Sequence, residues 1–526
     1  MAANFKANDI YQALKGSNAF SLTDYQVAAI ESDPARPALI IAGAGSGKTE
    51  LMAVRVLWLV ANGHCLPGEV LGLTFTRKAA ASLTKRIGNA IAQLRKTEFW
   101  PSELQTVSTP PVISTYNSYA NSLFRDSALA LGYEPESLLL SEAQRYQLAR
   151  QVVLKHAGEV IRDIDELDKK PNDIIDAVLS MASEMNDHDS ELADIASVAW
   201  SHAAKLDDLA PTKLKGTQST IDELRAGFAL IPALAQLAQL FREEKHRLGY
   251  VDFSDQVLLA KRALDLTDLA EQQQNLYKHI LLDEYQDTSY LQTALLEGLF
   301  KGRPVYAVGD PNQSIYGWRG ASSSNLAEFL NQFATEELEV AKYELPTSWR
   351  NPSLVLDIAN SIAAPLKSKP TYSNQALVDV DKLLPRPGAD VGDIEVDFLP
   401  TLPEEVAKVA DWFAKDINAA KSAGVAQPTA ALLLRKRAAM SDFVAALQNR
   451  GISVEVLGLG GLLQMPEIID LVAALKVINS PSAGTALIRL LTGARWQIGA
   501  KDIAALNSFA DALGRSKSGD REQDGY

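Results

Sequence analysis

The chain has 526 residues, more than one hydrophobic core usually serves, so about two to four domains are expected. A formal net charge of −14 argues against a protein that coats nucleic acid through bulk charge, and the single cysteine, Cys65, excludes an internal disulfide or a cysteine-rich zinc site. The sequence shows neither a signal peptide at its start nor an apolar stretch that we expect to cross a membrane, which predicts a cytoplasmic protein without membrane contact.

The first segment with recognisable chemistry is Ala38–Thr49. An apolar run predicts a buried strand, a glycine-rich turn follows, and Lys48 and Thr49 open a helix that runs to about Ala61. This order is typical of the phosphate loop of a P-loop NTPase, which binds ATP. Lys48 would reach the β- and γ-phosphates, and the Thr49 hydroxyl would hold Mg²⁺. The loop residues expected to contact the nucleotide are Ala42, Gly43, Ala44, Gly45, Ser46 and Gly47. The strict pattern has glycine in place of Ala42, and an ordinary glycine-rich turn is the alternative.

The next elements extend this unit into a parallel sheet. A second apolar run at 70–75 and a helix from Arg77 to about Leu94 form another strand–helix pair. From about Asp126 to Tyr277 helical periodicity dominates, which predicts a helical insertion. Strand-like runs return at 279–282 and 304–309, so the insertion interrupts one domain.

Two of these strands end in polar residues suited to chemistry on a phosphate. Asp283 and Glu284 follow the first run; Asp283 would hold Mg²⁺ and Glu284 would polarise an attacking water. A solvated strand end is the alternative for an isolated Asp-Glu pair. After the second run, Gln313 is placed to sense a γ-phosphate. The side chains suited to stacking and backbone contact with single-stranded nucleic acid are Tyr316, Trp318 and Arg319, although simple packing would also explain them.

A second α/β region begins near Tyr343. Its expected strands are 394–398, 430–434 and 452–456, with helices between them. A mostly helical stretch runs from 458 to 513. The polar tail at 514–526 is expected to be disordered.

Taken in order, these motifs resemble the series found in superfamily 1 DNA helicases of the UvrD/PcrA/Rep type. The resemblance runs from about Ser21 to the end of the predicted helical stretch, and Ala42 is usual in that family. It implies that Gln26 reads adenine, that Trp349 offers adenine a flat face and that Arg350 touches the γ-phosphate. The residues that it places along the single strand are Phe75, Thr76, Tyr316, Trp318 and Arg319.

The resemblance also implies a domain plan. A first RecA-like, ATP-binding domain would comprise residues 1–125 and 276–342, with the helical insertion at 126–275. A partial second RecA-like domain would occupy 343–457, followed by the start of a second helical insertion at 458–513 and the tail at 514–526. The expected fold class is therefore α/β with a C-terminal helical segment.

Three departures from the family pattern qualify this plan. Glu50 stands where such helicases usually have arginine, so the adenine pocket is expected to be looser, and Asn117 stands where histidine is commoner. Two segments that complete the second RecA-like domain of the family, one with a transition-state arginine, are not found. On this basis we expect the chain to bind ATP better than it hydrolyses it.

The functional expectation is an ATP-dependent helicase or translocase that moves 3′ to 5′ on single-stranded DNA, acts on duplex DNA and serves repair or recombination. Some stretches, such as 491–499, resemble the motor part of AdnAB-type helicase–nucleases, which implies a possible second subunit. The alternative is a DNA-binding or scaffolding subunit that binds ATP without hydrolysing it.

Overall fold

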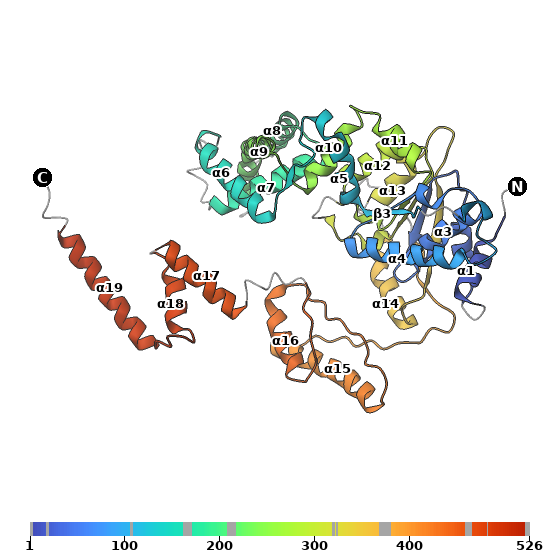
Figure 1. Ribbon diagram of the computed structural model, residues 1–526. Helices are drawn as coiled ribbons and strands as arrows, with labels where there is room; N and C mark the ends of the chain where they lie inside the picture. Colours follow the sequence, from blue (N-terminus) through green and yellow to red (C-terminus); the bar gives the residue numbers. More distant parts are fainter. Residues whose placement is uncertain are drawn as a thin grey trace. The chain divides into compact units, whose positions relative to one another are not determined.

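The computed structural model describes residues 4–16, 20–105, 109–160, 171–207, 217–317, 321, 324–367, 380–457, 465–480 and 482–520. The chain divides into two compact units, residues 1–394 and residues 395–526. Figure 1 shows the elements of both in chain order. All residues predicted to bind nucleotide or DNA belong to the first unit.

The first unit is built on a six-stranded parallel sheet with the order β3-β2-β6-β7-β1-β8. The strands are β1 (Ala38–Ala42), β2 (Val70–Thr74), β3 (Val112–Thr115), β6 (His279–Leu282), β7 (Val305–Gly309) and β8 (Ala341–Leu345). Every residue of β1 is buried, and Ile40 lies between Val308 of β7 and Tyr343 of β8. Because the strands are parallel, the loops that follow β1, β2, β6 and β7 share one edge of the sheet, where ligands bind in such folds. The expected α/β class is confirmed.

Helices cover both faces of this sheet because its strands alternate between two hydrophobic clusters. Ile40 packs with one cluster, whereas Leu39 and Ile41 pack with the other. The first cluster contains α1 (Ala7–Lys15), α2 (Asp24–Ile30), α3 (Lys48–Ala61) and α4 (Arg77–Leu94), of which α1, α3 and α4 contact one another (Figure 1). The second contains α5 (Tyr116–Ser127), α10 (Phe253–Ala263), α11 (Leu269–Leu276), α12 (Tyr290–Phe300) and α13 (Asn325–Gln332).

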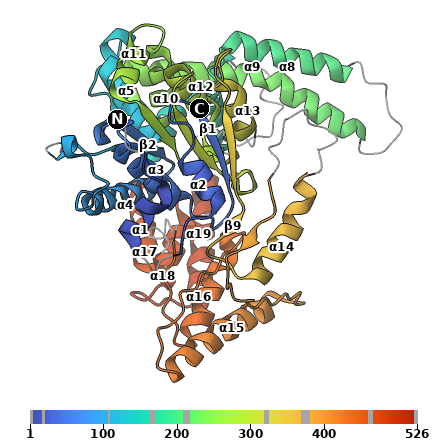
Figure 2. The same cartoon turned by 90° about the vertical axis from the view of Figure 1, so that its right-hand side faces the viewer.

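Between β3 and β6 lie four helices that share a hydrophobic cluster of their own, whereas α10 and α11, also within the predicted insertion, pack in the core of the sheet. The four helices are α6 (Glu142–Val160), α7 (Pro171–Asp187), α8 (Leu192–Asp207) and α9 (Thr217–Arg247), and Figure 2 shows α8 and α9 side by side. The two-residue strands β4 (Leu138–Leu139) and β5 (Tyr250–Val251) pair with each other. By length and composition alone, Ser219–Arg247 could cross a membrane, which the sequence analysis did not expect. In the structure Ala235, Ala238 and Phe241 of this helix are fully buried in the cluster.

A buried charged group joins the end of α9 to the start of α10. The Lys245 ammonium lies 2.7 Å from a carboxylate oxygen of Asp252 and 2.5 Å from one of Asp255. Asp252 also caps α10 by accepting the Asp255 N–H. Arg145 adds a second cation, 3.3 Å from the same Asp252 oxygen. The loss of Lys245 would leave the buried Asp255 carboxylate without its cation, which is costly inside a protein.

The region after β8 is divided between the two units. Residues up to Ile394 group with the first unit, including β9 (Thr347–Ser348), α14 (Ser353–Ala363) and β10 (Leu384–Pro385). The second unit contains α15 (Leu402–Ser422), α16 (Met440–Gln448), α17 (Pro466–Asn479), α18 (Gly484–Thr492) and α19 (Ala500–Asp520). The domain boundaries drawn from the resemblance stay a prediction.

Three predicted strands and part of the predicted disordered tail are wrong in this region. Residues 394–398, 430–434 and 452–456 are irregular rather than strands. The Phe398 and Leu433 side chains are 101% and 91% exposed, so these apolar runs lack the neighbouring strand that a sheet requires. Residues 514–520 of the predicted disordered tail continue α19, and 521–526 lie outside the described residues.

Candidate functional site

The glycine-rich loop at the end of β1 has the backbone that a phosphate loop needs. Gly45 and Gly47 adopt positive φ angles of 78° and 87°, which a residue with a Cβ rarely adopts. Gly47 is the N-cap of α3, so the loop leads directly into the positive end of a helix. A Cβ at Gly45 would also lie 2.6 Å from Ser348 Oγ and 2.8 Å from Arg350 Cβ. Arg350 therefore lies beside the loop, where a contact with the γ-phosphate is predicted.

Lys48 and Glu284, predicted from two distant motifs, meet in an ion pair. The Lys48 Nζ lies 2.8 Å from Glu284 Oε2, and the Gln286 side-chain amide donates to the same oxygen at 2.9 Å. Glu284 has φ 49° and ψ 46°, a left-handed conformation that costs a non-glycine residue about 1–3 kcal/mol. Glu284 therefore combines a strained backbone with an ion pair to the lysine of the phosphate loop.

Asp283 is a buried carboxylate with one oxygen that has no hydrogen-bond partner among the described residues. Its Oδ2 accepts from the Thr74 hydroxyl at 3.4 Å, whereas its buried Oδ1 has no hydrogen-bond partner. Burial and the neighbouring Glu284 raise the pKa of Asp283 to about 6, although Lys48 acts in the opposite direction. A bound cation beside this carboxyl would favour its charged form and so lower the pKa of Asp283.

Asp287, to which the sequence analysis gave no role, shares these features. Its Oδ1 is also buried without a partner, and burial and Glu284 raise its pKa to about 6. Within the described residues no three His, Cys, Asp or Glu side chains gather into a metal cage. Mg²⁺ in nucleotide sites commonly uses one or two carboxylates together with phosphate oxygens, so Asp283 and the Thr49 hydroxyl are a chemically suitable donor set.

A chain of hydrogen bonds connects Glu284 to the predicted γ-phosphate sensor. Gln286 donates to Glu284 through its amide nitrogen and accepts the Asp310 backbone N–H at 3.0 Å through its oxygen. The Asp310 carboxylate accepts in turn from the Gln313 side-chain amide at 2.6 Å. Gln286 and Asp310 were missed as positioning residues, although both lie inside the motifs that the sequence analysis quoted.

The residues predicted to bind adenine contact the same loop from the other side. Gln26 closes a capping box with Thr23, and its amide donates to the Ser46 carbonyl at 3.4 Å. The Trp349 backbone N–H donates to the Gly45 carbonyl at 2.8 Å. Gln26 and Trp349 therefore both contact the phosphate loop, and their roles toward adenine stay a prediction.

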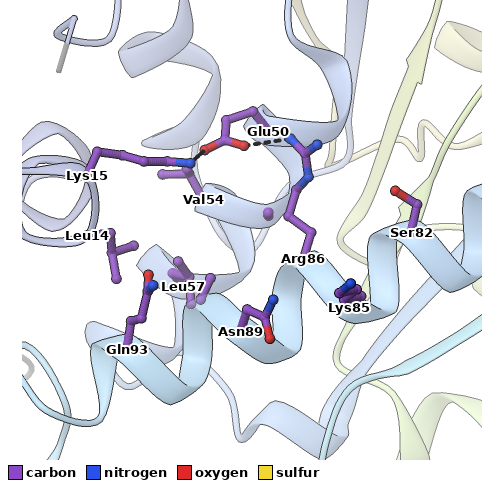
Figure 3. Close-up of a pocket in the computed structure, with 12 residues that line it drawn as sticks. Leu14, Lys15, Glu50, Val54, Leu57, Ser82, Lys85, Arg86, Asn89 and Gln93 are labelled. Atoms are coloured by element: carbon purple, nitrogen blue, oxygen red, sulfur yellow. Dashed lines mark hydrogen bonds and ion pairs between the residues drawn. The ribbon is translucent and has the colours of Figure 1, made fainter.

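Glu50 is turned toward other partners. Its carboxylate pairs with Lys15 at 2.9 Å and with Arg86 at 2.7 Å. Figure 3 shows these pairs at the edge of a pocket of about 440 Å³ between α1, α3 and α4. This pocket is lined by helix side chains rather than by the phosphate loop, so we do not assign it to the nucleotide.

Three of the five residues predicted to contact single-stranded DNA lie within the part of the chain that the structure describes. The Phe75 and Tyr316 rings, which follow β2 and β7, lie 4.6 Å apart at an angle of 40°. Thr76 is exposed and caps α4 by accepting the Ala79 N–H. Trp318 and Arg319 lie outside the described residues. Asn117 accepts from the Gln292 amide at 2.8 Å, which gives it a structural contact.

Comparison with known proteins gives two family matches. The UvrD/REP helicase N-terminal domain matches residues 22–334, and the UvrD-like helicase C-terminal domain matches residues 343–515. The second match covers the region that was expected to hold only part of a second RecA-like domain. The UvrD-like helicase C-terminal domain is therefore present in this chain. The absence of the two completing segments stays a prediction.

Similar curated proteins are longer than this chain. The ATP-dependent DNA helicase UvrD1 of Mycobacterium leprae (strain TN) is 24% identical over 496 residues, which cover 91% of this chain and 55% of the relative. The ATP-dependent DNA helicase PcrA of Leuconostoc citreum is 24% identical over 484 residues, with the same coverage. DNA helicase II of Escherichia coli (strain K12) is 26% identical over 345 residues, 65% of this chain and 40% of the relative. The chain thus spans about half the length of the curated relatives that it matches.

Proposed function

Because this chain belongs to the UvrD/REP helicase family, we propose that it is an ATP-dependent motor that moves along single-stranded DNA. The observation that carries the proposal is the convergence of Lys48, Glu284 and the Gln286–Gln313 hydrogen-bond chain at one sheet edge. The Phe75–Tyr316 ring pair follows two strands of the same sheet and so lies at that edge.

The proposed chemistry follows from these contacts. When ATP binds, its phosphates would compete for Lys48 and free the Glu284 carboxylate to accept a proton from the attacking water. Asp283 and Thr49 would hold Mg²⁺, which supplies charge neutralisation at the phosphates. Gln313 would then transmit the state of the γ-phosphate through Asp310 and Gln286.

The finer parts of the proposal rest on the resemblance. We propose 3′ to 5′ movement, a role in DNA repair or recombination, action on duplex as well as single-stranded DNA, and a cytoplasmic location. Kinship with the motor part of AdnAB-type helicase–nucleases, with a second subunit as partner, is a further proposal. The rival function is a DNA-binding or scaffolding subunit that binds ATP without turnover.

The deciding experiment measures ATP hydrolysis with and without single-stranded DNA, beside binding of a fluorescent ATP analogue. A motor hydrolyses ATP faster when DNA is added, whereas the rival subunit binds the analogue without DNA-stimulated turnover. Lys48→Ala should abolish analogue binding, and Lys301→Ala, at an exposed lysine of an i,i+4 pair, should leave it unchanged. Analogue binding by Lys48→Ala at wild-type strength would refute the phosphate-loop assignment.

A further inference from the structure

An aromatic pair, Phe20 and the partly buried Trp349, lies next to the phosphate loop. The Phe20 and Trp349 ring centroids are 5.4 Å apart, with an angle of 56° between the ring planes. The Phe20 side chain is 60% exposed, so it contributes little to a hydrophobic core. The Trp349 backbone N–H bonds to the Gly45 carbonyl of the loop, and the Gln26 side chain reaches the same loop at Ser46.

The backbone around Phe20 is held in place although its ring is exposed. Ser21 Oγ accepts from the Gln12 side chain at 3.3 Å, and the Leu22 N–H donates to Asn8 Oδ1 at 3.2 Å. Both partners belong to α1, which packs on α3. Phe20 is therefore an exposed ring on an anchored backbone, a suitable arrangement for contact with a ligand.

The resemblance implies that adenine stacks between Trp349 and a cationic side chain at position 50, but position 50 is a glutamate in this chain. Glu50 cannot supply the cationic face that arginine provides at this position in related helicases. Its carboxylate is moreover engaged by Lys15 and Arg86 (Figure 3). A second face for the base must therefore come from another residue near Trp349, and Phe20 is in ring contact with it.

We infer that Phe20 and Trp349 together form the aromatic clamp for the nucleobase of ATP, with Phe20 as a specificity-determining residue. The inference rests on the proposed function, and it adds a residue for which no motif provides a signal. Stacking on two faces requires about 7 Å between the rings, twice a contact distance of about 3.5 Å. At a separation of 5.4 Å the two rings contact each other directly, so entry of the base requires the exposed Phe20 ring to rotate away from Trp349.

The test compares ligands with and without a base. Calorimetry measures the dissociation constants of ATP and of inorganic tripolyphosphate for the wild type, Phe20→Ala, Phe20→Tyr and a control. Phe253→Ala is the matched control because Phe253 is 51% exposed but begins α10, at the helical insertion. Phe20→Ala should weaken ATP binding about five- to tenfold, the low end expected for one stacked base. Phe20→Tyr should stay within about twofold of the wild type because it keeps the aromatic face.

The outcomes separate this inference from the proposed function. Tripolyphosphate binding should be equal in all variants, because that ligand has no base to stack. Equal ATP binding by Phe20→Ala and the wild type, or an equal loss for ATP and tripolyphosphate, would overturn the clamp and leave the motor intact. A wild-type chain that binds neither ligand would overturn both.

Discussion

The substitution Asp283→Asn tests the central electrostatic claim about the site. The Asp283 side chain is buried, and its pKa is raised from 3.8 to about 6 by burial and by Glu284. At about 1.4 kcal/mol per pKa unit, this difference makes the charged form unfavourable in the folded protein by about 3 kcal/mol. Asparagine keeps the shape of the side chain and removes the charge, so the ligand-free variant should be the more stable protein at pH 8.

The sign of the pH dependence follows from the direction of the pKa change. Folded Asp283 binds a proton more tightly than the unfolded chain does, so ν, the number of bound protons, is larger in the folded state between pH 3.8 and about 6. The stability that this carboxyl contributes is complete below pH 3.8 and is lost as the pH rises through about 6. The advantage of Asp283→Asn should therefore approach about 3 kcal/mol at pH 8 and shrink toward pH 5.

The assay is urea unfolding of the ligand-free chain at pH 5 and pH 8. The exposed Asp265→Asn serves as control and should change stability by less than about 0.5 kcal/mol. Addition of Mg²⁺ and ATP should stabilise the wild type more than Asp283→Asn, because only the wild type offers the carboxylate ligand. An Asn variant that is no more stable than the wild type at pH 8, or whose advantage does not change with pH, would refute the claim.

Three further substitutions test other parts of the structure. Glu284→Gln should reduce DNA-stimulated ATP hydrolysis by about 100-fold or more while ATP binding persists, and near-normal turnover would exclude Glu284 as the base. Phe75→Ala should weaken single-strand binding by about 1–3 kcal/mol in a fluorescence titration if a base stacks there, and unchanged affinity would mark Phe75 as a packing residue. Lys245→Met should lower stability in urea unfolding by about 3–5 kcal/mol, because it removes the cation that pairs with the buried Asp255 carboxylate and leaves Asp252 with Arg145 alone; an unaltered unfolding midpoint would contradict that pairing.

The sequence predicts the centre of the site well because its signals are local. A strand, two glycines with positive φ and a helix beginning at Lys48 are encoded within a dozen residues. The carboxylates of Asp283 and Glu284 follow a buried strand, and parallel pairing then brings them to the same edge. The sequence pattern could not predict that Glu284 has a left-handed backbone or that Asp287 has a carboxylate oxygen without a hydrogen-bond partner.

The failed predictions concern features that depend on distant partners. Residues 430–434 have the composition of a strand, yet a strand forms only where another strand offers its hydrogen bonds. No strand was predicted at Ala341–Leu345, where β8 completes the first sheet by pairing with β1, about three hundred residues earlier. The Phe20–Trp349 contact is equally non-local, since it joins a residue before α2 to one after β9. The spacing of apolar residues within either segment does not predict a contact between the Phe20 and Trp349 rings.

The position of β1 has a consequence for synthesis. This apolar strand is flanked by β7 and β8, both of which lie more than 260 residues later in the chain. During translation Ala38–Ala42 therefore emerges long before either neighbour. One of its edges stays unpaired until β7 ends at residue 309, and the other until β8 ends at residue 345. Unpaired apolar strands are sites of aggregation in nascent chains, so the first unit of this protein should depend on chaperones or on slow, late assembly of its sheet.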